Sequence, residues 1–306
     1  MVQIKANGIN IEYDEIGPKD GIPILLIMGF GAQMTSWTPV FREALAAQGM
    51  RVIRFDNRDV GLSQRFEGAP SPREAIQAMA EGRKPDVPYT LNDMAADAAG
   101  LLEALGIASA HILGASMGGM IAQLTVLNHP KKSRSLISVF SSTGDPSLPR
   151  TSPEAQAVLL NPPPSPARED VVAHSVKNRK FYASTRWVSE DAEVAALIGA
   201  AYDRSYDPQG VARQYAAIVA TPPRTEKLKG LKRPALVLHG TKDTLIPWQA
   251  GAHTAASIPG SEFVLIDGWG HDIPAAGVPT LVDYIAPFVR RTEVYRAELK
   301  ARQAAA

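Results

Sequence analysis

The 306-residue sequence predicts an α/β protein with a mostly parallel sheet and helices on both faces. Short apolar runs alternate with stretches of helical periodicity, which is the pattern of repeated strand–helix units. Several of these runs, such as Ile24–Met28, are apolar throughout, as expected of strands whose two faces are both covered. These two observations together favour one sheet enclosed between two layers of helices.

Eight segments have the composition of strands. The first two, Val2–Ile4 and Ile9–Tyr13, flank the dipeptide Asn7-Gly8, which is typical of a two-residue turn and predicts an opening hairpin. Six further segments are expected to form buried strands: Ile24–Met28, Val52–Phe55, Ala110–Leu113, Ser135–Phe140, Ala235–His239 and Glu262–Ile266.

The helices between the strands are indicated by their ends. Thr90–Asp93 has the spacing of a capping box, an apolar stripe follows it, and Gly106 stands where this helix would stop. A second helix is expected to begin at Ser36 or Thr38 and to run through Ala47.

One interval, residues 143–229, breaks the alternation. It contains no strand-like run, opens with a proline-rich stretch, and continues with helix-forming residues that include Trp187 and several tyrosines. Aromatic and aliphatic residues are too frequent here for a disordered linker. We therefore predict an insertion of several helices after the sixth strand, and a core formed by residues 1–142 and 230–306.

Composition narrows the class of protein further. Hydrophobic residues make up 45% and charged residues 21% of the chain, as in an ordinary globular protein, and the net charge is +1. The basic residues are dispersed, which argues against nucleic acid or a membrane surface as a partner. There is no cysteine, so disulfides and thiol nucleophiles are excluded, and no segment has the pattern of a signal peptide or membrane span. A cytoplasmic protein is the expectation.

The stretch Gly114–Gly118 has the form G-x-S-x-G, with Ser116 at its centre. It follows an apolar run and opens a helical one, which is the strand–turn–helix context of a nucleophile elbow. The apolar residues of the following helix recur at helical spacing and form one stripe: Met117, Met120, Ile121, Leu124 and Leu127. The amino end of that helix would direct free N–H groups toward an anion forming beside Ser116.

A serine nucleophile needs a base, and histidine is suited to this role because its pKa lies close to neutrality. Of six histidines, His271 follows the last predicted strand in a glycine-rich loop, from which its ring can reach the carboxyl edge of the sheet. Asp243, after the preceding strand, is the expected carboxylate that orients this ring. Asp145 is the alternative, whereas Asp272 is a sequence neighbour of His271 and is poorly placed for the role.

The oxyanion that forms during attack by a serine on a carbonyl needs two backbone donors. The amide of Met117, directly after the nucleophile, is one candidate. The second is expected from the loop Met28–Gly31, with the amide of Phe30 as the choice.

The order Ser116, Asp243, His271 is that of the α/β-hydrolase fold, and the chain resembles the α/β-hydrolase family over nearly its full length. Within the family, three stretches resemble the aclacinomycin methylesterase-like branch: residues 29–33, 55–63 and 114–123. The resemblance implies hydrolysis of carboxylic esters through an acyl-serine, beneath a helical cap. Many relatives carry histidine before the oxyanion glycine, where this chain has Met28, so support for that loop must come from elsewhere.

The expected fold is therefore an α/β-hydrolase fold, with a mostly parallel eight-stranded sheet and a helical cap after strand 6. The expected function is that of a serine carboxylesterase that needs no cofactor or metal and takes a small-molecule ester with a hydrophobic group. Trp37 and Trp187 are the tryptophans expected to line the pocket. The same three residues could instead serve C–C bond hydrolysis, lactone opening or perhydrolysis, and the fold could also serve a non-enzymatic ligand receptor. The sequence makes no prediction of the oligomeric state.

Overall fold

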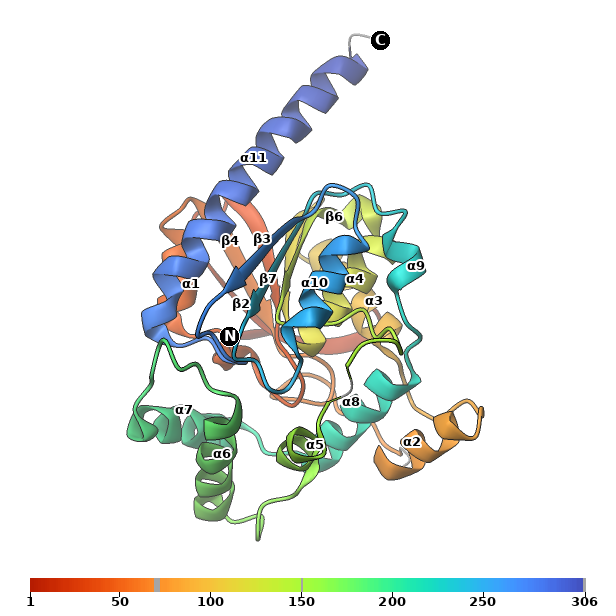
Figure 1. Cartoon of the computed structure of the whole chain (residues 1–306). Helices are drawn as coiled ribbons and strands as arrows, with labels where there is room; N and C mark the ends of the chain where they lie inside the picture. The colour runs from red at the N-terminus through yellow and green to blue at the C-terminus, as the bar shows by residue number, and fades with distance from the viewer. Residues whose placement is uncertain (69–71, 150, 305–306) are drawn as a thin grey trace.

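The computed structural model describes residues 1–68, 72–149 and 151–304, and its centre is a single eight-stranded sheet (Figure 1). The strand order is β1-β2-β4-β3-β5-β6-β7-β8. The first two strands pair antiparallel, β2 also runs antiparallel to β4, and all later pairings are parallel. The strands are β1 Val2–Ala6, β2 Ile9–Ile16, β3 Ile22–Ile27, β4 Met50–Phe55, β5 Ala110–Ala115, β6 Ser133–Val139, β7 Ala235–Gly240 and β8 Glu262–Ile266.

All eight predicted strands are present, with ends that differ by a few residues. The opening hairpin forms around Asn7-Gly8, where both residues have positive φ, of 49° and 81°. Such angles are the requirement of a type I′ turn, which matches the twist of the two strands that it joins. The mostly parallel sheet predicted from the sequence is therefore confirmed.

Helices cover both faces of the sheet (Figure 1). On one face lie α1 (Pro39–Ala46) and α11 (Val278–Ala304), and on the other lie α3 (Leu91–Ala104), α4 (Met117–Asn128) and α10 (Trp248–Ala256). The expected capping box of α3 forms, and Thr38 caps α1. In the described part of the chain, three short 3-10 helices complete the core: Met34–Ser36, Pro130–Lys132 and Ala275–Gly277.

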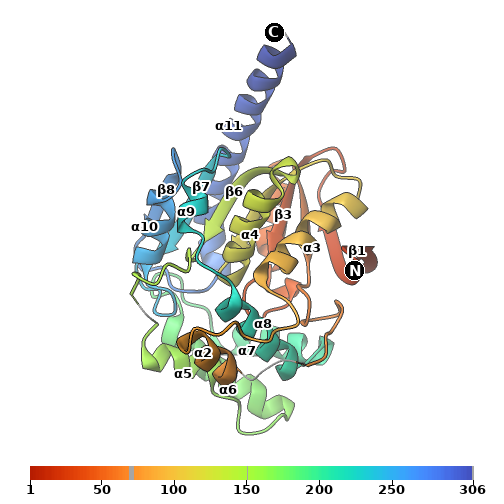
Figure 2. The same cartoon turned by 90° about the vertical axis from the view of Figure 1, so that its right-hand side faces the viewer.

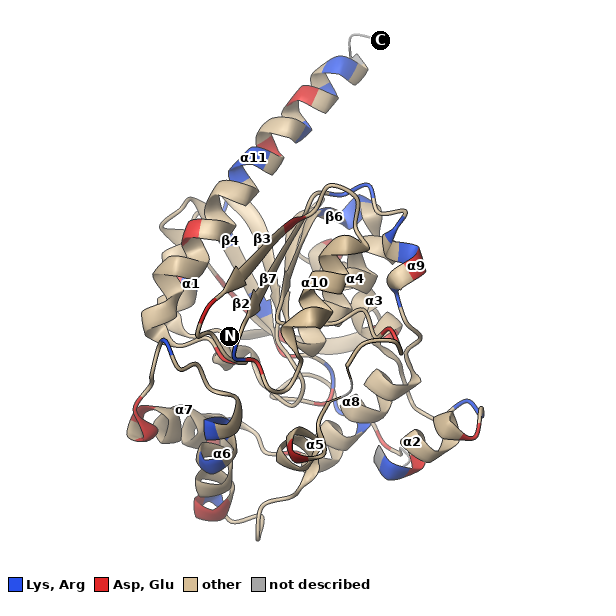
Figure 3. Ribbon diagram, viewed as in Figure 1, with Lys and Arg blue, Asp and Glu red and all other residues tan. Residues whose placement is uncertain are grey.

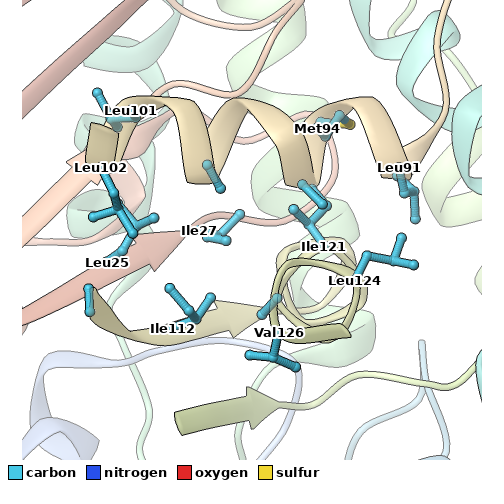
Figure 4. Close-up of a cluster of buried hydrophobic side chains, with 14 of the residues drawn as sticks. Leu25, Ile27, Leu91, Met94, Leu101, Leu102, Ile112, Ile121, Leu124 and Val126 are labelled. Atoms are coloured by element: carbon cyan, nitrogen blue, oxygen red, sulfur yellow. The ribbon is translucent and has the colours of Figure 1, made fainter. Parts of the chain in front are cut away.

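The larger apolar cluster fills the space between the sheet and the helices α3 and α4 (Figure 4). Ile27 and Ile112 point from adjacent strands toward Met94 of α3 and Ile121 of α4. The sequence predicted that α4 buries one apolar stripe, but the buried surface of α4 is wider, because residues 121–126 are all buried. The reason is that α4 is enclosed by the sheet on one side and by α3 on another.

Between β6 and β7, the described part of residues 143–229 contains five helices and no strand, and we call this interval the insertion. Its longer helices lie beyond the edge of the sheet at which β5, β7 and β8 end (Figures 1 and 2). One further helix, α2 (Pro72–Ala80), follows β4 in the chain and packs against α8. It is not among the helices predicted from the sequence. The helices of the insertion are α5 Pro153–Leu160, α6 Arg168–Tyr182, α7 Asp191–Arg204, α8 Pro208–Ala220 and α9 Thr225–Leu228.

The last turns of α11 project from the body of the protein on the side opposite the insertion (Figure 1). Both signs of charge alternate along this projecting part (Figure 3). Among the described residues, no helix combines the length and the apolar character needed to cross a bilayer.

Candidate active site

Ser116 lies at the sharp turn between β5 and α4. Its φ and ψ are 59° and −123°, a strained conformation for a residue with a side chain. The turn brings α4 against β3, and a Cβ atom on Gly118 would lie 2.0 Å from the carbonyl oxygen of Ile27. Glycine is therefore required at position 118 by close approach of two backbones. The Ser116 side chain is left at the carboxyl edge of the sheet and is partly exposed.

Asp243 lies just after β7 and is held from several directions. Its Oδ1 accepts hydrogen bonds from the backbone N–H groups of Leu245 (3.0 Å) and Ile246 (2.9 Å). Its Oδ2 lies 2.7 Å from Nδ1 of His271 and 3.2 Å from Nε2 of His239. Burial alone would raise the pKa of Asp243, but the two histidines outweigh it through charge and hydrogen bonding and lower the pKa to about 2. Asp243 is thus a carboxylate at neutral pH.

His271 connects Asp243 to Ser116. Its Nε2 lies 2.9 Å from Oγ of Ser116, and its ring packs on Phe140 with 4.5 Å between ring centroids. The backbone N–H of His271 donates to the carbonyl of Tyr182 in the insertion. When Nδ1–H donates to Asp243, Nε2 is free to accept the hydroxyl proton of Ser116. The structure therefore places Ser116, His271 and Asp243 in one hydrogen-bonded line.

The two other aspartates considered in the sequence lie in different networks. Asp145 accepts hydrogen bonds from Ser147 and Thr225. Asp272 forms an ion pair with Arg179 of α6 at 2.6 Å and accepts the backbone N–H of Ser184. Neither carboxylate is hydrogen-bonded to the ring of His271.

The loop Met28–Gly31 lies directly beside Ser116. A Cβ atom on Gly29 would lie 3.0 Å from Cβ of Ser116 and 3.6 Å from its Oγ. Within the described residues, the amide N–H groups of Phe30 and Met117 donate to no protein acceptor. Two free amides, one in this loop and one directly after Ser116, have the chemistry needed to bind an oxyanion.

Asn57 supports this loop, a role that was not predicted from the sequence. Its Nδ2 donates to the carbonyl of Met28 at 2.9 Å, and only 2% of Asn57 is exposed. This hydrogen bond comes from the turn after β4 and supports the loop at the position where many relatives carry histidine. The only sequence signal was the resemblance of residues 55–63 to the methylesterase-like branch.

The expectation that Trp37 lines a pocket is wrong. Its side chain has no exposed surface and stacks on Phe41 in the apolar cluster between the sheet and the helices α1 and α11. Trp187 packs against Trp269 with 6.4 Å between ring centroids, and its ring lies against Gly277. These contacts make Trp187 an anchor between the insertion and the core, and we do not assign it to substrate binding.

Ion pairs fasten the insertion to the turn after β4. Asp59 accepts two hydrogen bonds from Arg213 of α8, at 2.8 and 2.9 Å, and Asp56 pairs with Arg204 of α7 at 2.7 Å. The hydroxyl of Tyr89 also donates to Asp59, and burial, together with the charge of Asp59, raises the pKa of Tyr89. These residues hold the insertion and the turn after β4 together beside the candidate site.

The chain belongs to the α/β-hydrolase family. A family model described as the α/β-hydrolase fold matches residues 22–275, which is more than half of the chain. The fold class expected from the order of strands, helices and motifs is therefore confirmed.

The relatives agree with the branch that the sequence resembles. The chain is 26% identical to a rhodomycin D methylesterase of Streptomyces sp. strain C5, over 95% of this chain and 98% of the relative. It is also 26% identical to the rhodomycin D methylesterase of Streptomyces peucetius, with the same coverage. The structure of a thermophilic esterase from Thermogutta terrifontis matches with a TM-score of 0.67 and 25% identity, over 98% of this chain and 99% of that one.

Proposed function

We propose that the protein is a serine carboxylesterase in which Ser116, His271 and Asp243 form a catalytic triad. The observation that carries the proposal is the continuous line from Ser116 Oγ through the His271 ring to Asp243, with distances of 2.9 and 2.7 Å. A hydroxyl in this position has a base to take its proton and a buried carboxylate to hold that base. The methylesterase and esterase relatives support an ester as the substrate.

In the first half of the reaction, Oγ of Ser116 attacks the ester carbonyl while His271 Nε2 takes the hydroxyl proton. The carbonyl oxygen becomes an oxyanion, which the amides of Phe30 and Met117 stabilise together with the amino end of α4. The tetrahedral intermediate then releases the alcohol, which takes its proton from His271. Asp243 stabilises the positive imidazolium between these two transfers.

In the second half, water attacks the acyl-serine and gives a proton to His271. The new tetrahedral intermediate breaks its bond to Oγ, and Ser116 recovers the proton from His271. The carboxylic acid leaves and the starting state is restored. Each step uses groups of this chain and one water molecule.

Residues 143–229 form the cap in this proposal. Their longer helices lie beyond the carboxyl edge of the sheet, and Tyr182 of α6 approaches His271 both with its carbonyl oxygen and with its ring. Burial raises the pKa of Tyr182, so its phenol stays neutral beside the histidine. A substrate would therefore be held between the cap and the edge of the sheet, and its hydrophobic group would face the insertion.

The test is hydrolysis of p-nitrophenyl esters of graded acyl length, together with methyl esters, lactones and a C–C ring-cleavage substrate. Wild-type protein should hydrolyse at least one ester, and a fluorophosphonate probe should label it once, at Ser116 as located by peptide mass spectrometry. Ser116→Ala should lose both turnover and labelling while its melting temperature stays near that of the wild type. Full ester turnover by Ser116→Ala would rule out the proposed triad.

A further inference from the structure

Gln214 of α8 connects two loops that belong to the core. Its Oε1 accepts the backbone N–H of Gly31 at 2.9 Å, and its Nε2 donates to the carbonyl of Arg58 at 2.8 Å. The side chain has no exposed surface, so both ends of its amide are satisfied inside the protein. The insertion thus contributes one buried amide that joins the loop beside Ser116 to the turn after β4.

The bond to Gly31 falls within a tight turn. The N–H of Ala32 donates back to the carbonyl of Gly29, which leaves Phe30 and Gly31 as the two central residues, and Gly31 has a φ of 66°. The N–H of the Phe30–Gly31 peptide donates to Oε1 of Gln214, and this bond constrains the orientation of the peptide. Without this acceptor the partly buried N–H of Gly31 would lose its hydrogen bond to the protein, and the peptide would be free to reorient.

Two other side chains of α8 contact the same loop. Val211 lies against Gly31, because a Cβ atom added to Gly31 would be 3.3 Å from Cγ1 of Val211. The ring of Tyr215 meets the ring of Phe30 edge-on, with 5.8 Å between centroids. The helix α8 is itself fixed to the core by the pair of Arg213 with Asp59. The loop therefore packs against a helix that is itself ion-paired to the core.

We propose that Gln214 is a positioning residue for the oxyanion hole, so that the insertion aligns the Phe30 amide as well as covering the site. This inference rests on the proposed function. Gln214 acts through the peptide that follows Phe30 and does not touch the reacting atoms. Asn57 supports the loop from the Met28 side, and Gln214 supports it from the Gly31 side.

The principal test is Gln214→Leu, which replaces the amide with an apolar side chain of similar volume and removes both hydrogen bonds. Complete loss of an oxyanion donor typically lowers kcat about 100- to 1000-fold, and misalignment of one donor should lower it about 10- to 100-fold. KM should change by less than about threefold, because the interaction is made in the transition state. The rate of labelling by the fluorophosphonate should fall in proportion to kcat.

Asn178→Leu is the matched control. Asn178 is also an amide of the insertion, and its Nδ2 donates to the backbone carbonyl of Val158 without reaching the core loops. This variant should keep wild-type kcat and labelling. An equal fall of kcat in both variants would overturn the proposal, because the effect would then come from loosening of the insertion.

Gln214→Glu separates positioning from folding. The introduced carboxyl can still accept from Gly31, but it can donate to the Arg58 carbonyl only when protonated. The ratio of its kcat to that of wild type should therefore rise as the pH falls, and the ratio for Gln214→Leu should stay flat. A kcat for Gln214→Glu as low as that of Gln214→Leu at every pH, in protein with wild-type near-UV circular dichroism, would contradict the assigned role.

The failure of this inference and that of the proposed function are distinguishable. If wild-type protein neither hydrolyses esters nor reacts with the fluorophosphonate, the proposed function is wrong. If wild-type protein does both and Gln214→Leu matches it in kcat and labelling rate, only the role of Gln214 is wrong.

Discussion

Asp59 and Arg213 form a two-fold hydrogen-bonded ion pair that joins the turn after β4 to α8, although 154 positions separate them in the sequence. Both side chains are buried, and Asp59 has no exposed surface. Arg213 precedes Gln214 in the same helix turn. The pair therefore constrains the position of α8 along its axis and its rotation about that axis. The same helix contacts the loop beside Ser116.

Breaking this pair on one side should destabilise the protein. Arg213→Met leaves the Asp59 carboxylate buried with Tyr89 as its remaining side-chain donor, and loss of one partner of a buried pair costs about 3–5 kcal/mol. The double variant Asp59→Asn with Arg213→Met should lose less than the sum of the two single losses, because no unpaired charge remains. Urea unfolding of the three variants measures this, and additive losses would argue against a coupled pair.

Asp243→Asn should abolish most of the turnover while leaving the fold intact. An amide in this position favours the wrong tautomer of His271, and an equivalent change in a Ser-His-Asp triad lowers kcat about 10,000-fold. Asp145→Asn, at the other strand-end aspartate, should keep wild-type kcat. Steady-state kinetics with the best ester of the panel gives both values, and inactivity of Asp145→Asn alone would reassign the carboxylate.

The stability contributed by Asp243 should depend on acid pH. Its pKa in the folded protein, about 2, lies below the ordinary value of 3.8, so its contribution is complete above about pH 4 and is lost as the pH falls toward 2. The shift corresponds to about 2 kcal/mol. The difference in unfolding free energy between wild type and Asp243→Asn should shrink by about this amount from pH 5 to pH 2. A constant difference would mean that the aspartate is not stabilised in its charged form.

Gly118→Ala tests the close packing of the elbow. The added methyl group would overlap the Ile27 carbonyl, so the turn that presents Ser116 would have to move. Overpacking of this kind typically costs about 1–3 kcal/mol, and the shift of the nucleophile should also lower kcat. Gly230→Ala is a fair comparison, because a methyl group there would meet only the Lys227 carbonyl at 3.6 Å and should be neutral. Thermal unfolding and kcat of the two variants provide the measurement.

The sequence predicted the sheet and the three strand-end residues because both depend on local patterns. Apolar runs fix where strands lie, and parallel strands present their carboxyl ends at one edge. Ser116, Asp243 and His271 each follow such an end, so their proximity could be expected before the fold was known. Their participation in catalysis is a proposal that the experiments above test.

The supporting residues could not be predicted in the same way. Gln214 and Gly31 are 183 positions apart, and a single glutamine in a helix has no pattern that marks an internal partner. Asn57 likewise contacts Met28 across the gap between two strands. Trp37 was misplaced because an aromatic residue near a glycine-rich loop can face either a pocket or the core, and only packing against Phe41 decides between them.

The attachment of α8 also bears on how this protein could be re-engineered. Exchange of the whole insertion with that of a relative would remove Gln214 together with its bond to Gly31. If the proposed roles of the insertion and of Gln214 hold, we expect the rate to fall whatever substrate the new insertion accommodates. Within the described residues, helices α5 and α6 carry no such bond to the loop Met28–Gly31. Under the proposed function, we expect libraries that vary α5 and the first turns of α6, with α8 kept, to alter substrate selectivity with a smaller loss of rate than libraries that vary α8.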